Sequence, residues 1–481
     1  MDMFKRRRDE FMKLIGDAVA IIPGETESQR NHDVLHPFRQ SSDFVFLTGF
    51  EEPDAVAVFD PDHPTERYVL FVRPRDRERE IWDGYRAGTE GAMADYGADA
   101  AYPISELNKR IRSHLRGHRT VYFPWGARHE DEVRAGLAAS NATRVRNGLQ
   151  SPEAIADPRP ILAEMRLFKT DAEAELLRRA CDISVQGHIE AMRFAQPGMH
   201  EYQVQAAMEY VFRSHGSNRD GYPAIVASGP NACILHYTDN RRLMESGDLL
   251  LIDAAAEFGF FSSDITRTFP VNGRFSAPQR AVYEVVLSAQ VRSLEACVLG
   301  APLESVHDTS TRVISEGLSE LGLVPTSPEE TLEMGLYREF FMHGTSHWLG
   351  LDVHDAGKYR LEGSSRPLEP GMSFTVEPGV YIDPKRPEVE FTMFPYDEQA
   401  IADDIAEFGP EEAGSRREAA MADAPRVLHA VPQELLGIGV RIEDDVLMTG
   451  DGALNMTAAL PRLIEDVEHL CSESSSVPAI V

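Results

Sequence analysis

The sequence predicts two domains, an α/β domain followed by a larger domain that combines long helices with strands (α+β). Its 481 residues exceed what a single hydrophobic core usually organises. The first 160 residues alternate short strand-like and helix-like segments, whereas long amphipathic helices appear beyond residue 168. We therefore predict domains at 1–165 and 166–481.

The first domain opens with a short amphipathic helix rather than a cleaved signal peptide. Acidic residues interrupt the apolar stretch of MDMFKRRRDEFMKLIGDAVAII, and no small-residue cleavage site follows it. The apolar residues expected on one side of this helix are Phe4, Phe11, Met12 and Ile15.

Apolar runs bounded by turn residues predict the strands of this domain, and amphipathic segments predict its helices. The predicted strands are DAVAIIPG (17–24), DFVFLTGF (43–50), DAVAVFD (54–60) and RYVLFVRP (67–74). The predicted helices cover 105–117 and 129–141.

The second domain follows a stretch with three prolines at 151–168. Thr170 is a good N-cap for the long helix that comes next, because its hydroxyl can satisfy a free backbone N–H. Further helices are expected at 203–215, 277–298 and 304–321. The expected strands include GDLLLIDAAAEF (247–258), SFTVEPGVYI (373–382) and GVRIEDDVLM (439–448).

Residues 383–434 depart from this pattern. From Asp397 to Glu434 the chain has ten acidic residues against three arginines, with few aromatic residues. We expect an acidic insertion outside the core, either a partly ordered excursion or an acidic flap.

Composition narrows the classes of partner. A formal net charge of −30 argues against nucleic acid and anionic membrane surfaces. No apolar run approaches the roughly 18 residues needed to span a bilayer. The four cysteines are widely spaced and form no CxxC pair, which indicates free thiols in a reducing compartment. We expect a cytoplasmic protein.

The stretch FMHGTSHWLGLDVHD (341–355) holds His343, His347 and His354. The first two are four residues apart, as in the zinc-binding helix H-E-x-x-H, but Gly344 stands where the catalytic Glu belongs. The residues Gly-Thr-Ser between them also disfavour a continuous helix. A zincin site is therefore excluded, and any partners of these histidines must come from elsewhere in the chain.

Carboxylates recur in or beside apolar strands of the second domain, at Asp253, Asp264, Glu377 and Glu443. Taken singly, each is more readily explained by a salt bridge or a helix cap. Buried carboxylates are costly unless they are paired or coordinated, so four of them with a histidine-rich segment indicate cations. Four carboxylates and one imidazole suit Mn²⁺, Co²⁺ or Fe²⁺, and two ions that share bridging carboxylates fit this donor set better than one.

Eight stretches, in order along nearly the whole chain, carry a resemblance to a known family. They are HPFRQSSDFVFLTGFEEPDAV, EIWDGYRAG, EMRLFKT, GYPAIVASGPNACILHYT, LLLIDAAAEFGFFSSDITRTFPVNGRFS, FMHGTSHWLGLDVHD, LEPGMSFTVEPGVYI and GIGVRIEDD. Together they resemble the aminopeptidase P branch of the pita-bread metallopeptidases, which cleave N-terminal Xaa-Pro bonds. The resemblance implies a creatinase-like α/β first domain and a second domain with the duplicated, curved-sheet pita-bread fold.

The resemblance also implies the ligands of two divalent ions, which we expect to be Mn²⁺. These ligands are Asp253, Asp264, His347, Glu377 and Glu443. Asp264 and Glu443 would bridge the ions, with Asp253 on one ion and His347 and Glu377 on the other. Glu377 is also the expected proton carrier to the leaving nitrogen.

Other matched positions belong to the substrate pocket. His236, His343 and His354 match histidines that are not ligands but act on the substrate, and Arg441 matches a position that orients a carboxylate. Tyr222 and Trp82 fall on pocket positions, with Trp82 supplied by the first domain of the same or a neighbouring subunit. A match of Asp33 is loose.

We therefore expect an aminopeptidase for peptides with proline in the second position. The alternative is a prolidase restricted to Xaa-Pro dipeptides, which a narrow mouth beside the acidic insertion would favour. A binding protein that has lost activity on the same fold is a third possibility, disfavoured because all five ligand positions are intact. The family also implies a homo-oligomer, either a dimer or a tetramer.

Overall fold

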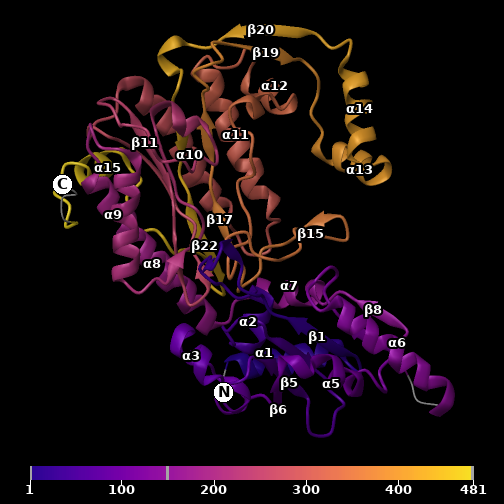
Figure 1. Ribbon diagram of the computed structural model, residues 1–481. Helices are drawn as coiled ribbons and strands as arrows, with labels where there is room; N and C mark the ends of the chain where they lie inside the picture. Colours follow the sequence, from indigo (N-terminus) through magenta and orange to yellow (C-terminus); the bar gives the residue numbers. More distant parts are fainter. Residues whose placement is uncertain (1–2, 148–150, 478–481) are drawn as a thin grey trace. The chain divides into compact units, whose positions relative to one another are not determined.

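The chain folds into two units, Met1–Arg166 and Leu167–Val481, drawn in Figure 1 from a computed structural model. The structure describes residues 3–147 and 151–477. Within them the four cysteines are free thiols, as expected. No helix of this described part combines the length and apolar character needed to cross a bilayer.

Unit 1 is built on a mixed sheet with the strand order β6-β5-β4-β1-β7-β8. Pairs β1–β4 and β4–β5 are antiparallel, and the other pairs are parallel. The strands are β1 (Val19–Pro23), β4 (Val56–Phe59), β5 (Tyr68–Val72), β6 (Ala100–Pro103), β7 (Thr120–Tyr122) and β8 (Ala154–Ala156). Three of the four predicted strands are β1, β4 and β5, and they are buried throughout.

The helices of unit 1 agree with the sequence pattern at most positions. They are α1 (Met3–Ile15), α2 (Ser42–Thr48), α3 (Arg77–Asp83), α4 (Gly88–Ala94), α5 (Leu107–His114) and α6 (Glu130–Asn147). Helix α7 (Arg159–Leu167) ends at the unit boundary. Phe11, Met12 and Ile15 of α1 are buried, which confirms the expected apolar side of the first helix.

The strand predicted at 43–50 is wrong, because DFVFLTGF forms α2. A short apolar run fits a buried helix as well as a buried strand, so periodicity alone could not decide. Gly49 ends the helix in the left-handed conformation, with φ of 66°. A Cβ at Gly49 would lie 2.7 Å from the ring of Phe4, so the glycine also lets α1 pack closely here.

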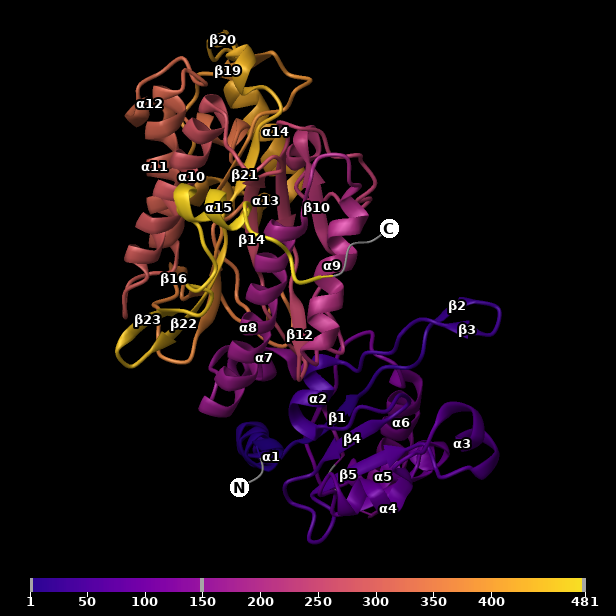
Figure 2. The same ribbon diagram turned by 90° about the vertical axis from the view of Figure 1, so that its left-hand side faces the viewer.

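Unit 2 surrounds its strands with long helices (Figure 2). The longest are α8 (Asp171–Phe194), α9 (Glu201–Ser214), α10 (Ala277–Ala296) and α11 (Glu304–Glu320). Helix α8 packs against α9, and α10 packs against α11. Thr170 stands before α8 as expected, and its backbone N–H donates to the Glu173 carboxylate at 2.8 Å.

Two sets of short antiparallel strands form the centre of unit 2. The first set is β10 (Ile225–Ser228), β11 (Leu249–Asp253) and β14 (Thr266–Pro270); the second is β17 (Ser373–Val376), β22 (Asp444–Thr449) and β23 (Gly452–Asn455). A further pair joins β18 (Gly379–Tyr381) to β21 (Gly439–Arg441). The N–H of Glu443, the residue before β22, donates to the Thr266 carbonyl of β14 at 3.0 Å, so a hydrogen bond links the two sets.

The segment 383–434 differs from the expected excursion. It forms β19 (Glu388–Thr392), α13 (Glu398–Phe408), α14 (Pro410–Met421) and β20 (Arg426–Ala430). Strands β19 and β20 pair, and Val389 and Phe391 are buried in the core that α10 and α11 also contribute to. The expectation that the whole segment lies outside the core is therefore wrong for β19. The alternating order EVEFT was a strand signal that the acidic composition obscured.

Candidate metal centre

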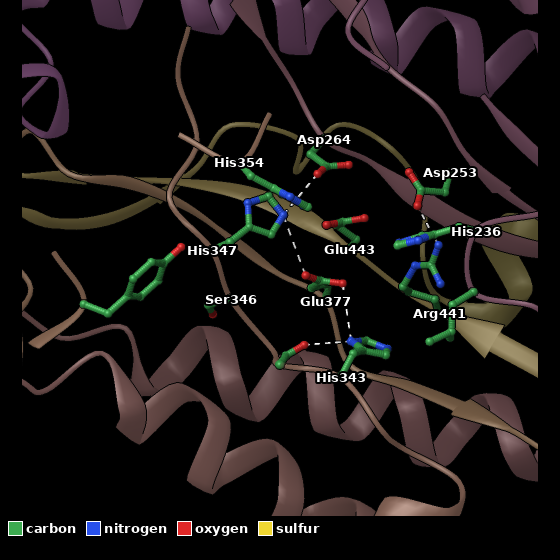
Figure 3. Close-up of a pocket in the computed structure, with 13 residues that line it drawn as sticks. His236, Asp253, Asp264, His343, Ser346, His347, His354, Glu377, Arg441 and Glu443 are labelled. Carbon is green, nitrogen blue, oxygen red and sulfur yellow. Dashed lines mark hydrogen bonds and ion pairs between the residues drawn. The ribbon is translucent and has the colours of Figure 1, made fainter. Parts of the chain in front are cut away.

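A cavity of about 400 Å³ lies in unit 2, and residues in or next to the strands of both sets line its wall (Figure 3). It is lined by Leu235, His236, Asp253, Asp264, His343, Gly344, Ser346, His347, His354, Tyr359, Glu377, Arg441 and Glu443. We refer to it as the central cavity. The structure thus brings together the five predicted ligands, the three other histidines of the predicted site and Arg441.

The carboxylates enter the central cavity where strands end. Asp253 is the last residue of β11, and Asp264 lies between β13 (Phe261–Ser262) and β14. Glu377 falls between β17 and β18, and Glu443 between β21 and β22. The prediction of continuous strands at 373–382 and 439–448 is wrong, because each is interrupted at its glutamate. Pro378 cannot donate to a strand ladder, so the first of the two strands is interrupted there.

His347 faces the carboxylates through one ring nitrogen. Its Nδ1 lies 3.0 Å from the Trp348 carbonyl and donates to it, which directs Nε2 into the cavity. That Nε2 lies 3.2 Å from the Asp264 carboxylate and 3.7 Å from the Glu377 carboxylate. Asp264, His347 and Glu443 offer ligand atoms within 4.8 Å of one another. No other group in the described part of the chain meets this test for a metal site.

Tyr222 supports two of the carboxylates from behind. Its hydroxyl lies 2.6 Å from an oxygen of Asp253 and 2.6 Å from an oxygen of Asp264. A phenol has one proton, so it can donate to only one of them at a time. Arg441 donates to the other oxygen of Asp253 at 2.5 Å. This hydrogen bond to Asp253 is the geometric basis for the orienting role predicted for Arg441.

The acids repel one another strongly. Burial raises the pKa of Glu377 to about 7. Burial and the neighbouring carboxylates, Asp264 foremost, raise the pKa of Glu443 well above its usual range. Burial also raises the pKa of Asp253, although Arg441 opposes that shift. The carboxylates therefore lack sufficient counter-charge from protein groups.

The pKa of His347 is shifted so that its charged form is favoured, unlike the pKa values of the acids. Burial disfavours its charged form, but the hydrogen bond and charge of Asp264 outweigh this effect and raise its pKa to about 9. One imidazole and the Arg441 guanidinium still leave part of the charge of the four carboxylates uncompensated. The donor set of carboxylate oxygens and one imidazole nitrogen fits divalent cations such as Mn²⁺, which would supply the counter-charge.

A chain of hydrogen bonds links Arg441 to His343. The Arg441 guanidinium donates to the Tyr381 hydroxyl at 2.8 Å, and that hydroxyl lies 2.8 Å from Nε2 of His343. Nδ1 of His343 lies 2.7 Å from the Gly344 carbonyl, so it carries the proton and Nε2 accepts from Tyr381. Burial, assisted by Arg441, lowers the pKa of His343 to about 3. His343 is therefore a neutral ring in a fixed orientation.

The remaining histidines of the predicted site occupy the cavity wall. The His354 ring lies edge-on to the His347 ring, with centroids 4.2 Å apart. Burial and the neighbouring His347 lower the pKa of His354. His236 lines the cavity and is exposed to solvent. Both imidazoles can reach a ligand in the cavity.

Two residues of the predicted site lie in unit 1. Trp82 is on α3 with 85% of its surface exposed. Asp33 is exposed between β2 (Gln29–Asn31) and β3 (Val34–Leu35). Their part in a substrate pocket stays a prediction.

Sequence reasoning missed Tyr381 and Thr266. Tyr381 connects Arg441 to His343, and the Thr266 hydroxyl donates to the Glu443 carboxylate at 2.7 Å. Tyr381 pairs with Gly439 across β18 and β21, two residues from Arg441. Pairing SFTVEPGVYI with GVRIEDDVLM in the sequence would have placed this tyrosine beside the arginine.

Comparison with known proteins gives full-length matches. Residues 4–122 match the family model "Aminopeptidase P, N-terminal domain", and residues 175–450 match "Metallopeptidase family M24". The chain is 38% identical over 466 residues to the Xaa-Pro aminopeptidase of Haemophilus influenzae, covering 97% of this chain and 96% of that protein. It is also 38% identical over 470 residues to the Xaa-Pro aminopeptidase of Escherichia coli, covering 97% of each.

Solved structures agree with these matches. Pseudomonas aeruginosa aminopeptidase PepP superimposes with a TM-score of 0.86 at 38% identity, covering 98% of this chain and 97% of that one. A variant of Escherichia coli aminopeptidase P in complex with substrate gives a TM-score of 0.85, with the same identity and coverage.

Proposed function

Because this chain belongs to metallopeptidase family M24, we propose that it is a metallo-aminopeptidase that hydrolyses the N-terminal Xaa-Pro bond of peptides. The observation that carries the proposal is the convergence of five potential ligands on one cavity from positions spread between 253 and 443. The relatives reported above are Xaa-Pro aminopeptidases at full-length coverage, which supports the same substrate class.

We propose that two divalent ions, Mn²⁺ by preference, are held by the predicted ligands. These ligands would be Asp253, Asp264, His347, Glu377 and Glu443. Divalent ions bound there supply the charge that makes a water molecule nucleophilic near neutral pH and polarises the scissile carbonyl.

Glu377 is proposed as the proton carrier. It would take a proton from the attacking water and deliver it to the proline nitrogen as the bond breaks. Its carboxylate lies 3.5 Å from Nδ1 of His343 and 3.7 Å from Nε2 of His347, on the wall that faces the cavity. Bound cations stabilise its ionised form, so the carboxylate is ready to accept that proton.

Histidine side chains complete the proposed mechanism. His354 or His236 would donate to the carbonyl oxygen as negative charge develops on it. Proline has no amide N–H, so a clamp on that hydrogen cannot select it. Burial keeps His343 neutral, Tyr381 and Gly344 fix its orientation, and it offers a ring face that suits recognition of the proline ring.

Release of the first residue from an Xaa-Pro-Yaa tripeptide in the presence of Mn²⁺ tests the proposal. Wild type should cleave, and Glu377→Gln should lose activity by about a thousandfold or more, because the proton carrier and a ligand change together. Glu388→Gln, at an exposed position of β19, is the matched control and should keep full activity. Absence of cleavage by wild type would contradict the proposal, and faster hydrolysis of Xaa-Pro dipeptides would favour a prolidase.

A homo-oligomer, dimer or tetramer, and a cytoplasmic location remain proposals. The exposed Trp82 of unit 1 is a candidate to reach a neighbouring subunit. Light scattering of the purified protein, with Trp82→Ala beside wild type, would measure both the number of subunits and the contribution of this side chain.

A further inference from the structure

A second chamber of about 570 Å³ adjoins the central cavity in unit 2. The two share His343, Gly344, Ser346 and Tyr359 in their walls. The other walls come from the first turns of α11, from Arg338 and Met342, and from the hairpin of β15 (Arg360–Leu361) and β16 (Ser364–Ser365). The second chamber therefore adjoins the central cavity at these residues, where a ligand longer than the central cavity would extend.

The direction of a bound peptide follows from the type of reaction, and this step rests on the proposed function. An aminopeptidase substrate has one residue before the scissile bond, whereas the chain after proline has no fixed length. A chamber larger than the central cavity therefore suits the residues that follow proline.

Ser346, labelled in Figure 3 among the residues of the central cavity, also lines the second chamber and so marks their junction. Its Oγ is buried and has no hydrogen-bond partner among the described residues. A buried hydroxyl without a partner is unfavourable, and a peptide that passes the junction offers carbonyl oxygens that can accept from it. The junction thus has a polar group suited to a peptide backbone.

Arg338 is the second polar feature that points to a ligand. It lies in the 3₁₀ helix η3 (Leu336–Glu339), is half-buried and lines the second chamber. No carboxylate of the described chain lies at ion-pair distance from its guanidinium, although acidic residues outnumber basic ones by 78 to 48. Nearby arginines differ: Arg360 lies 3.8 Å from Glu304, and Arg386 lies 2.8 Å from Glu339.

Tyr396 holds the Arg338 guanidinium in place. The guanidinium carbon lies 4.6 Å from the centroid of the Tyr396 ring. That ring packs on Gly335, where a Cβ would come within 2.8 Å of it, and the Tyr396 N–H donates to the Glu333 carbonyl at 2.9 Å. A guanidinium supported by an aromatic ring keeps its N–H groups available for a carboxylate, which it can bind through two hydrogen bonds.

We propose that Arg338 is a specificity-determining residue that binds a carboxylate on the part of the peptide that follows proline. Two sources share this chemistry: the C-terminal carboxylate of a short peptide and an acidic side chain of a longer one. In either case the contact lies away from the reacting bond, so it strengthens substrate binding and appears mainly in KM.

The test uses the full-length protein with Mn²⁺ and matched peptides. Xaa-Pro tripeptides, tetrapeptides and pentapeptides are compared as free acids and as C-terminal amides, which isolates the terminal carboxylate. Amidated peptides with Asp or Asn at each position after proline isolate an acidic side chain. Each pair is measured with wild type, Arg338→Gln, Arg338→Lys and the control Arg386→Gln, whose arginine is paired with Glu339 outside the chamber.

We expect wild type to prefer the carboxylate-bearing member of at least one pair by about tenfold in kcat/KM. Arg338→Gln should abolish that preference while cleaving the uncharged member at the wild-type rate, and Arg338→Lys should retain part of it. Arg386→Gln should behave as wild type. Equal cleavage of every pair by wild type, or an unchanged preference in Arg338→Gln, overturns the inference alone. Cleavage of no peptide by wild type overturns the proposed function as well.

Discussion

Two buried clusters of acidic and histidine side chains, one in each unit, are composed in opposite ways. In unit 1, Asp60 lies 3.0 Å from Nδ1 of His114 and 2.9 Å from Nε2 of His118. In unit 2, four carboxylates share the central cavity with one histidine at ligand distance. The Asp60 carboxylate thus has two imidazole partners, with Glu66 3.5 Å from Nε2 of His114, whereas the four carboxylates of the central cavity share one imidazole at ligand distance.

The pKa values of the acids express this difference. Burial alone would raise the pKa of Asp60, but hydrogen bonds from His114 and His118 lower it to about 2. Burial raises the pKa of Glu377 to about 7, because the opposing charges of His347 and Arg441 do not outweigh burial and the repulsion from Asp264 and Asp253. The cluster in unit 1 is satisfied by its own residues and is structural. The cluster in unit 2 needs cations from outside, which is the property of a binding site.

The largest effect is expected from a substitution in the acidic cluster of unit 2. Glu443→Gln removes a proposed ligand, so we expect loss of bound Mn²⁺ and a decrease of about a thousandfold or more in Xaa-Pro-Yaa hydrolysis. Metal analysis and steady-state kinetics measure the two quantities. Glu388→Gln again serves as the control, and near-normal metal content with near-normal activity would refute the role of Glu443.

The next largest effect is expected on stability, from a substitution in the Asp60 cluster of unit 1. Asp60→Asn leaves two buried imidazoles without their shared acid, and we expect the free energy of unfolding of unit 1 to fall by about 3 kcal/mol. Denaturant unfolding followed by a probe in unit 1 measures it. Asp62→Asn, two residues away and exposed, should change little. Equal stability of both variants would show that the cluster is not structural.

The stability of unit 1 should depend on pH through Asp60 and His118. The lowered pKa of Asp60 contributes about 2 kcal/mol of stability that is present above pH 4 and lost as pH falls from about 4 to about 2. The hydrogen bond with Asp60 raises the pKa of His118, so its contribution is present below about pH 6.5 and lost as pH rises through the folded-state value. Unfolding curves between pH 2 and about pH 9 should lose both slopes in Asp60→Asn; retention of either would count against this explanation.

The smallest effect is expected on the stability of unit 2 when no divalent ion is bound. There Glu443 is destabilising, because its raised pKa means that the folded protein resists its ionised form. We expect Glu443→Gln to stabilise metal-free unit 2 by about 1 kcal/mol at neutral pH, the reverse of the effect of Asp60→Asn. Thermal unfolding in the presence of a chelator measures it. Marked destabilisation would indicate that Glu443 has a structural role.

The family and fold class follow from the sequence, and the comparisons confirm both: an α/β aminopeptidase P N-terminal domain before a pita-bread catalytic domain. The positions of Asp253, Asp264, His347, Glu377 and Glu443 were identified because buried acids are costly and because their motifs are specific. The structure brings them to one cavity. Their roles as ligands remain a proposal.

Features that depend on tertiary contacts were not accessible from the sequence. The helix α2 resembles a strand in composition, and only its packing beside Phe4 and its end at Gly49 distinguish it. The cluster of Asp60 with His114 and His118 joins residues more than fifty positions apart that belong to no motif. Arg338 is visible as an arginine in the sequence, but only the fold shows that no acidic side chain among the described residues pairs with it.

A crystal structure of the Mn²⁺-loaded protein, with anomalous data, would show whether the five side chains of the central cavity bind metal. We expect two anomalous peaks in this cavity. Oxygen or nitrogen atoms about 2.0–2.3 Å from them should belong to Asp253, Asp264, His347, Glu377 and Glu443. Manganese bound elsewhere, or these side chains turned away from the metal, would contradict it.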